Sequence, residues 1–192
     1  MSSFGFSVLS ALVAGLLVAA CADGAGRPIQ GGSGLLNSDI RSYRLGIGDK
    51  LRVTVYGEQD LSGQFEIGPQ GAIGMPLIGE IPAKGRMPQE IRDAVAAKLA
   101  SGYLKNPRVT VDVVAYRPFY VHGEVRSGGE FSYKSGMRVR DAVALAGGYT
   151  YRANQGHILL QRDGTEGEVR IALPSEIFIM PGDNIRVPER FF

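Results

Sequence analysis

Residues 43–55 read YRLGIGDKLRVTV, and this stretch decides the fold of the first half of the chain. Its last five residues alternate apolar and polar side chains, which is the pattern of a half-buried strand. Gly48 and Asp49 precede the strand directly, where glycine permits a positive φ and aspartate caps the local backbone. The stretch therefore predicts a tight turn that leads the chain into a β-sheet.

The same signal returns near the end of the chain. The hexapeptide GDKLRV at 48–53 resembles GDNIRV at 182–187, so that Gly182 and Asp183 repeat the pair before the first strand. Two similar turns at the start of two strands explain this echo better than a shared ligand site does. We therefore interpret Gly48, Asp49, Gly182 and Asp183 as structural turn residues.

Between these two signals the pattern alternates between short strands and two helices. Pro88 opens a helix at its first turn, and Ile91, Val95 and Leu99 form one apolar stripe along it. A shorter helix is predicted at 139–146, closed by a double glycine. Further strands are predicted within 65–83 and at 109–113, 119–125, 157–161, 169–173, 177–180 and 185–187, with a hairpin turn at Asp163-Gly164. The fold class is therefore α+β and rich in strands.

Composition divides the chain into segments. The apolar, uncharged start has the character of a targeting sequence, and the Gly- and Ser-rich stretch after it reads as a flexible tether. Ordered patterning begins at Tyr43, and a second patterned unit begins close to Phe119. The expected segments are a signal peptide at 1–20, a tether at 21–42, a first domain at 43–116 and a second at 117–192.

Cys21 is the one cysteine of the chain, so no internal disulfide is possible. It follows the small residues Val18, Ala19 and Ala20, a run that resembles the lipobox of bacterial lipoproteins. This pattern predicts cleavage before Cys21 and attachment of a lipid to its sulfur. The alternative is an ordinary signal peptide with a chance cysteine.

The chain shows no recognisable catalytic or cofactor motif. His122 and His157 do not stand in a metal-ligand spacing, so we expect no metal site, and no phosphate- or dinucleotide-binding loop occurs, so we expect no cofactor. With 21 basic and 19 acidic residues and no basic block among aromatics, nucleic-acid binding is not expected. A glycosidase pair hidden among the carboxylates stays open as a weaker alternative.

Aromatic side chains beside an arginine are the best candidates for contact with a sugar. Tyr116, Arg117 and Tyr120 cluster where the two units meet, and Tyr149 and Tyr151 follow the double glycine. Sugars stack on aromatic rings and accept hydrogen bonds from Arg and Tyr. Ordinary packing at a domain junction is the alternative for the same residues.

Several motifs in order resemble the bacterial polysaccharide-export proteins, the Wza-like outer-membrane family. The matching segments are 43–51, 73–79 and 106–109 in the first unit and 121–125, 146–148 and 181–190 in the second. The resemblance implies a polysaccharide-export domain at 43–116, followed by one β-grasp, soluble-ligand-binding module at 117–192. It also implies a short member of the family without a membrane-crossing helix of its own.

The resemblance implies a function as well as a fold. Such a protein is expected to be an outer-membrane lipoprotein that faces the periplasm and guides capsular or exopolysaccharide as a ring oligomer, without enzymatic activity. Its implied partners are the polysaccharide, an inner-membrane polysaccharide co-polymerase and a separate outer-membrane pore protein. The rival hypothesis is a periplasmic ligand-binding or scaffold lipoprotein that does not conduct polysaccharide.

Overall fold

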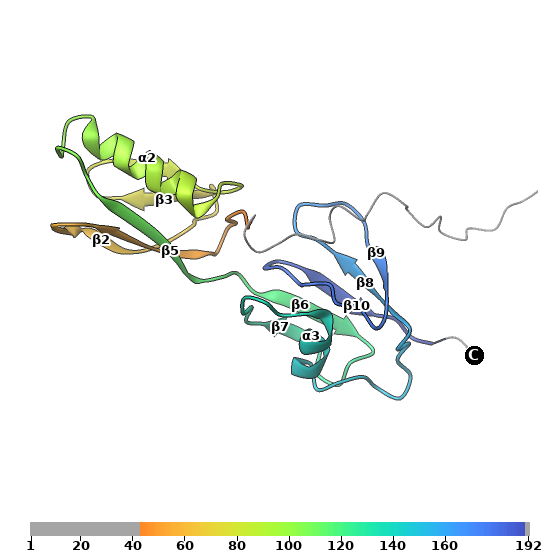
Figure 1. The fold of residues 1–192 in the computed structure, drawn as a ribbon. Helices are drawn as coiled ribbons and strands as arrows, with labels where there is room; N and C mark the ends of the chain where they lie inside the picture. Colours follow the sequence, from red (N-terminus) through yellow and green to blue (C-terminus); the bar gives the residue numbers. More distant parts are fainter. Residues whose placement is uncertain (1–42, 191–192) are drawn as a thin grey trace, which may run out of the picture.

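The computed structural model describes residues 43–190, which form two units joined along the chain (Figure 1). The first unit contains β1 (Lys50–Val55), β2 (Glu58–Glu66), β3 (Ala72–Met75), β4 (Gly79–Pro82), α2 (Pro88–Ala100) and β5 (Val109–Ala115). The second contains β6 (Phe119–Gly123), β7 (Gly129–Phe131), α3 (Val139–Leu145), β8 (His157–Gln161), β9 (Val169–Ala172) and β10 (Asn184–Val187). The predicted α+β class is confirmed.

The first unit is built on β1, the central strand of an antiparallel sheet with the order β2-β1-β5. Residues along β1 alternate between exposed and buried, and Leu51, Val53 and Val55 supply the buried face. Because successive side chains of a strand point to opposite faces, this alternation directs one apolar row into the core. The strand predicted from the opening stretch is confirmed.

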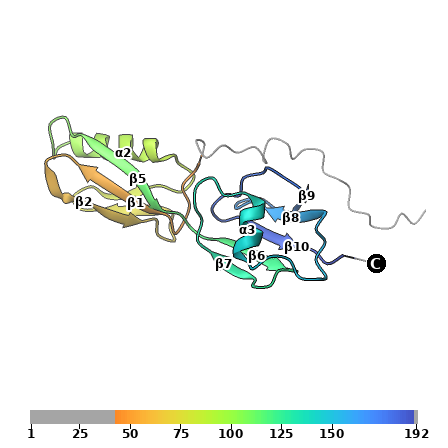
Figure 2. The ribbon, with the colours of Figure 1, turned by 60° about the horizontal axis from the view of Figure 1, so that its bottom comes forward.

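Helix α2 lies over the sheet of β1, β2 and β5 (Figure 2), and the β3-β4 hairpin contributes residues to the same core. The helix begins at Pro88, and the Glu90 carboxylate accepts a hydrogen bond from the backbone N–H of Met87 at 2.6 Å. The three residues of the predicted stripe are fully buried, and each such side chain contributes about 1.5–3 kcal/mol to stability. The predicted helix is confirmed.

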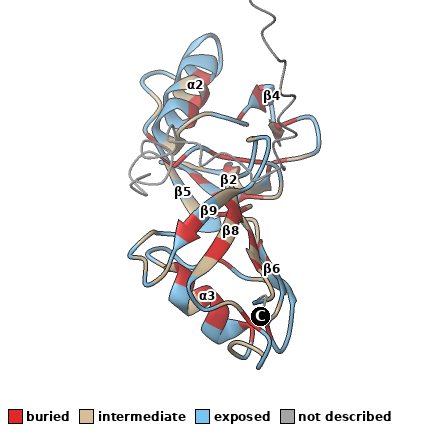
Figure 3. Cartoon of the chain, turned by 90° about the vertical axis from the view of Figure 1, so that its right-hand side faces the viewer, coloured by how far each residue is buried: buried red, intermediate tan, exposed pale blue. Residues whose placement is uncertain are grey.

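The second unit is a five-stranded sheet with the order β7-β6-β10-β8-β9, in which only β6 and β10 run parallel. Strands β8 and β9 form the hairpin predicted around Asp163-Gly164, and α3 is the predicted short helix. Figure 3 shows buried residues on α3 and on the strands of the sheet, and these residues belong to one core. This core is separate from that of the first unit.

Three predictions of local structure need correction. Strand β7 was not predicted, because it has three residues and none of them is buried. Strand β2 was not predicted, because its sequence EQDLSGQFE is mostly polar and Leu61 is its only buried residue. Residues 177–180 were predicted to be a strand, but they form a loop with a single bridge between Arg138 and Phe178. Their backbone groups bind the start of α3 instead, through the N–H of Val139 and the carbonyl of Met137.

The two units meet at a short connection between β5 and β6. Tyr116 lies in this connection and packs against the buried clusters of both units. No helix between residues 43 and 190 is long and apolar enough to span a membrane. The signal peptide, the tether and Cys21 lie outside the described residues.

Candidate functional site

The buried polar or charged residues of the described chain are two carboxylates, Asp49 and Asp183, and both lie where the units meet. Gly48 has a φ of 89° and Gly182 a φ of 84°, so each aspartate follows a left-handed turn. Asp49 accepts a hydrogen bond from the N–H of Gly46 at 2.7 Å, and Asp183 accepts one from the N–H of Met180 at 2.7 Å. The sequence echo thus corresponds to two equivalent aspartate-closed turns.

Arg117 links the Asp49 turn of the first unit to a loop of the second unit. Its backbone N–H donates to Asp49 Oδ1 at 2.8 Å, and its guanidinium Nη1 lies 3.2 Å from Asp49 Oδ2 and 2.8 Å from the Tyr43 hydroxyl. Its other terminal nitrogen, Nη2, pairs with Asp163 Oδ2 at 2.8 Å. One side chain therefore binds a buried group of the first unit and a loop of the second.

The Arg117 guanidinium lies in space that is open because two neighbouring residues are glycines. A Cβ atom at Gly46 would lie 2.1 Å from Nη1 of Arg117, and one at Gly182 would lie 2.7 Å from Nε. Both distances are far below van der Waals contact. A side chain at either position would therefore displace the Arg117 guanidinium from its place in the junction, and at Gly182 it would also strain the turn.

Asp183 has its own partner. Arg162 donates to Asp183 Oδ2 at 2.9 Å and to the Phe178 carbonyl at 3.1 Å. Burial raises the pKa of Asp183 to about 6, although the Arg162 charge acts in the opposite direction. The loss of hydration thus outweighs the ion pair, because the other carboxylate oxygen has no hydrogen-bond partner among the described residues.

Aromatic rings continue the junction alongside these charges. Tyr43, Tyr116 and Tyr133 form a ladder with ring centroids 5.1 and 5.3 Å apart, each pair meeting edge to face. Burial, followed by the hydrogen bond to Asp49, raises the pKa of the Tyr43 hydroxyl. Since the ladder begins in one core and ends in the other, it packs the two units against each other.

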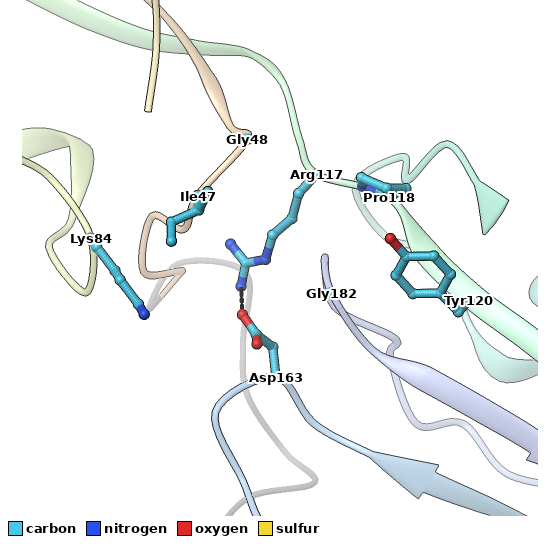
Figure 4. Close-up of a pocket in the computed structure, with 8 residues that line it drawn as sticks. All are labelled: Ile47, Gly48, Lys84, Arg117, Pro118, Tyr120, Asp163 and Gly182. Atoms are coloured by element: carbon cyan, nitrogen blue, oxygen red, sulfur yellow. Dashed lines mark ion pairs between the residues drawn. The ribbon is translucent and has the colours of Figure 1, made fainter. Parts of the chain in front are cut away.

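A cavity of about 300 Å³ opens beside Arg117 (Figure 4). The side chains that line it are those of Ile47, Lys84, Arg117, Pro118, Tyr120 and Asp163, together with the backbone of two glycines. Lys84 and Ile47 lie on one side of the guanidinium, and Pro118 and Tyr120 lie on the other. Residues of both units therefore line the cavity.

The five residues predicted to contact a sugar do not form a single site. Arg117 and Tyr120 line the junction cavity, whereas Tyr116 is used in packing between the cores. Tyr149 lines a different depression in the second unit, and Tyr151 stands free on the surface with 85% of its area exposed. Of the five predicted residues, only Arg117 and Tyr120 therefore line the same cavity.

Sequence reasoning missed Lys84 and Tyr43 as junction residues and treated Asp163 only as a turn. Lys84 comes from the loop after β4, and Asp163 comes from the loop after β8. Nothing in the local pattern distinguishes either one from an ordinary surface charge. Their approach to Arg117 results from the packing of the two units.

The two histidines lie on the sheet of the second unit. His157 has its Nδ1 3.3 Å from Nη2 of Arg170, and burial followed by this positive charge lowers its pKa. Across residues 43–190, no group of three or more His, Cys, Asp or Glu side chains is arranged to hold a metal ion.

Comparison with protein families gives two matches that together cover most of the described chain. Residues 37–114 match the family described as polysaccharide biosynthesis/export protein. Residues 118–171 match the SLBB domain. The boundary between the two matches falls at the connection that carries Tyr116 and Arg117.

Three proteins whose names refer to polysaccharides are similar in sequence to this chain. The chain is 35% identical over 137 residues to the exopolysaccharide production protein ExoF of Rhizobium meliloti (strain 1021), covering 65% of this chain and 32% of that protein. It is 29% identical over 192 residues to the EPS I polysaccharide export outer membrane protein EpsA of Ralstonia nicotianae, covering 82% and 50%. It is 26% identical over 108 residues to the polysialic acid transport protein KpsD of Escherichia coli, covering 55% and 19%. The chain spans at most half the length of these relatives.

Proposed function

The chain belongs to the polysaccharide export protein family, and on this premise we propose that it is a component of the machinery that exports an exopolysaccharide or capsular polysaccharide across the cell envelope. The observation that carries the proposal is the match of both units, in order, to the two modules of this family. The names of the relatives, which refer to exopolysaccharide production, polysaccharide export and polysialic acid transport, support the same function.

The junction supports a structural role in this process. A protein that guides a polymer must hold its modules in a constant relation while the polymer moves past them. Arg117 and the tyrosine ladder support that relation through contacts that involve both units, a buried pair with Asp49 and a half-exposed pair with Asp163 among them. The protein therefore acts by shape and by binding, and we assign it no catalytic step.

The position of the protein in the envelope follows from the same proposal. We place it at the outer membrane, facing the periplasm, with the lipid on Cys21 as its anchor. The relative EpsA is described as an outer membrane protein, which supports this location. A ring of identical subunits, an inner-membrane polysaccharide co-polymerase and a separate outer-membrane pore protein complete the proposed assembly.

The junction cavity is the proposed place of contact with the polymer. Tyr120 lines this cavity with 43% of its surface exposed, so its ring is open to a sugar face. Arg117 forms the wall beside it. Tyr149 and Tyr151 lie elsewhere on the second unit and stay as secondary candidates.

An in-frame deletion with complementation tests the proposal. The deletion should abolish surface polysaccharide while lipid-linked sugar precursors still form, because export rather than synthesis is lost. The gene supplied in trans should restore the surface polymer. Normal surface polysaccharide in the deletion strain, with no duplicate gene present, would instead favour a periplasmic ligand-binding or scaffold role.

A further inference from the structure

The charges that line the junction cavity are not all paired. The Arg117 guanidinium is occupied by Asp49, Asp163 and the Tyr43 hydroxyl. Lys84 also faces the cavity, and its ammonium group makes no hydrogen bond or ion pair with any other described residue. The cavity thus holds one cation whose charge no side chain of residues 43–190 neutralises.

The opposite wall offers complementary groups. Asp163 binds Arg117 through one carboxylate oxygen, and its side chain is 53% exposed, so its other oxygen is free to accept a hydrogen bond. Tyr120 and Pro118 add an aromatic ring and an apolar ring on the far side of the guanidinium (Figure 4). A ligand that fits these walls needs an anion, hydroxyl donors and one apolar face.

We infer that the cavity binds a single saccharide unit that carries a carboxylate, which rests on the proposed export function and names its substrate class. The carboxylate pairs with the Lys84 ammonium, a ring hydroxyl donates to Asp163, and the apolar face of the ring lies against Tyr120 and Pro118. A volume of about 300 Å³ is at the lower end of the range of ligand sites, which suits one sugar unit rather than a longer segment.

Competition among the charges determines which group recognises the anion. Arg117 is 15% exposed and already paired with two carboxylates, so a ligand anion would have to displace Asp163 to reach it. Lys84 can pair with the ligand anion without giving up an ion pair with another described residue. The lysine, rather than the arginine, is therefore the group that distinguishes an acidic sugar from a neutral one.

Titration of the purified full chain with defined oligosaccharides, followed by amide chemical shifts, tests the inference. The probes are a glucuronate-containing oligosaccharide, a neutral glucose oligosaccharide of equal length and inorganic phosphate. The acidic sugar should shift the amides of Gly48, Asp163 and Gly182, and it should bind more tightly than the neutral one at low salt. Phosphate should bind more weakly than the acidic sugar, because it cannot use the aromatic wall.

Matched variants identify the residue that is responsible. Lys84→Gln should weaken binding of the acidic sugar about fivefold, the effect of losing one partly exposed ion pair, and leave the neutral sugar unchanged. Lys134→Gln, at an exposed lysine away from the cavity, should change neither. Equal binding of both sugars, an unchanged affinity in Lys84→Gln or shifts that map elsewhere would overturn the inference.

The outcome is independent of the deletion test. A strain that loses surface polysaccharide while the purified protein ignores acidic sugars would retain the export function and refute this site. Lysine-dependent binding together with normal surface polysaccharide would retain the site and refute the export function.

Discussion

Replacing Arg117 with alanine should destabilise the protein more than any surface charge substitution, because its partner Asp49 is fully buried. Removing one member of a buried ion pair costs about 3–5 kcal/mol. Asp49 would keep the hydrogen bonds from Tyr43, Gly46 and the backbone N–H of residue 117, which places the loss near the lower limit. The half-exposed pair with Asp163 adds no more than about 1 kcal/mol.

The expected decrease in the free energy of unfolding is therefore about 3 kcal/mol, which for a chain of this size lowers Tm by on the order of 10 °C. Urea unfolding followed by far-UV circular dichroism measures it. Arg92→Ala is the matched control. Among residues 43–190, Arg92 pairs only with the adjacent Asp93 on the exposed face of α2, so its loss should change stability by less than about 0.5 kcal/mol. Equal stability of the two variants would show that Arg117 does not hold the junction.

Two further predictions concern Asp183 and Cys21. Burial raises the pKa of Asp183 to about 6, so the folded state binds a proton more tightly than the unfolded chain does. The protonated carboxyl therefore adds to the free energy of unfolding at acid pH, and this stabilisation is lost as the pH rises through 6. Relative to Asp183→Asn, the free energy of unfolding of the wild-type protein should fall by about 2 kcal/mol between pH 4 and pH 7. A difference that stays constant across that range would contradict the assignment. Mass spectrometry of the mature protein should find Cys21 at the N-terminus carrying a lipid, and an unmodified cysteine or another first residue would rule out the anchor.

The sequence predicted those helices and strands that bury one regular row of apolar side chains in a single hydrophobic core. Strand β1 and helix α2 each bury a regular apolar row, so their periods of two and of about 3.6 are visible without the rest of the molecule. Strand β2 lies at a sheet edge with a mostly polar sequence, and its pairing with β1 rather than its composition makes it a strand. Residues 177–180 are apolar enough for a strand but are held as a loop against α3.

The site was less predictable than the fold. The Gly-Asp echo identified both turns, and the cluster around Arg117 contains two residues, Arg117 and Tyr120, that line the junction cavity. The contact between Arg117 and Asp49 joins residues 68 positions apart, and no local pattern encodes it. Lys84 and Asp163 become site residues only when the two units are packed together, which is why the sequence offered no reason to select them.

Contact between the polymer and the junction is the central claim, and photo-crosslinking in living cells tests it most directly. A photoreactive phenylalanine analogue would replace Tyr120 in the cavity or, as the control, Tyr56, which is 80% exposed at the hairpin on the far end of β1 from the junction. In cells that export polysaccharide, irradiation should attach polymer at position 120 and not at position 56. No adduct at position 120 during active export, or equal adducts at both positions, would contradict the account.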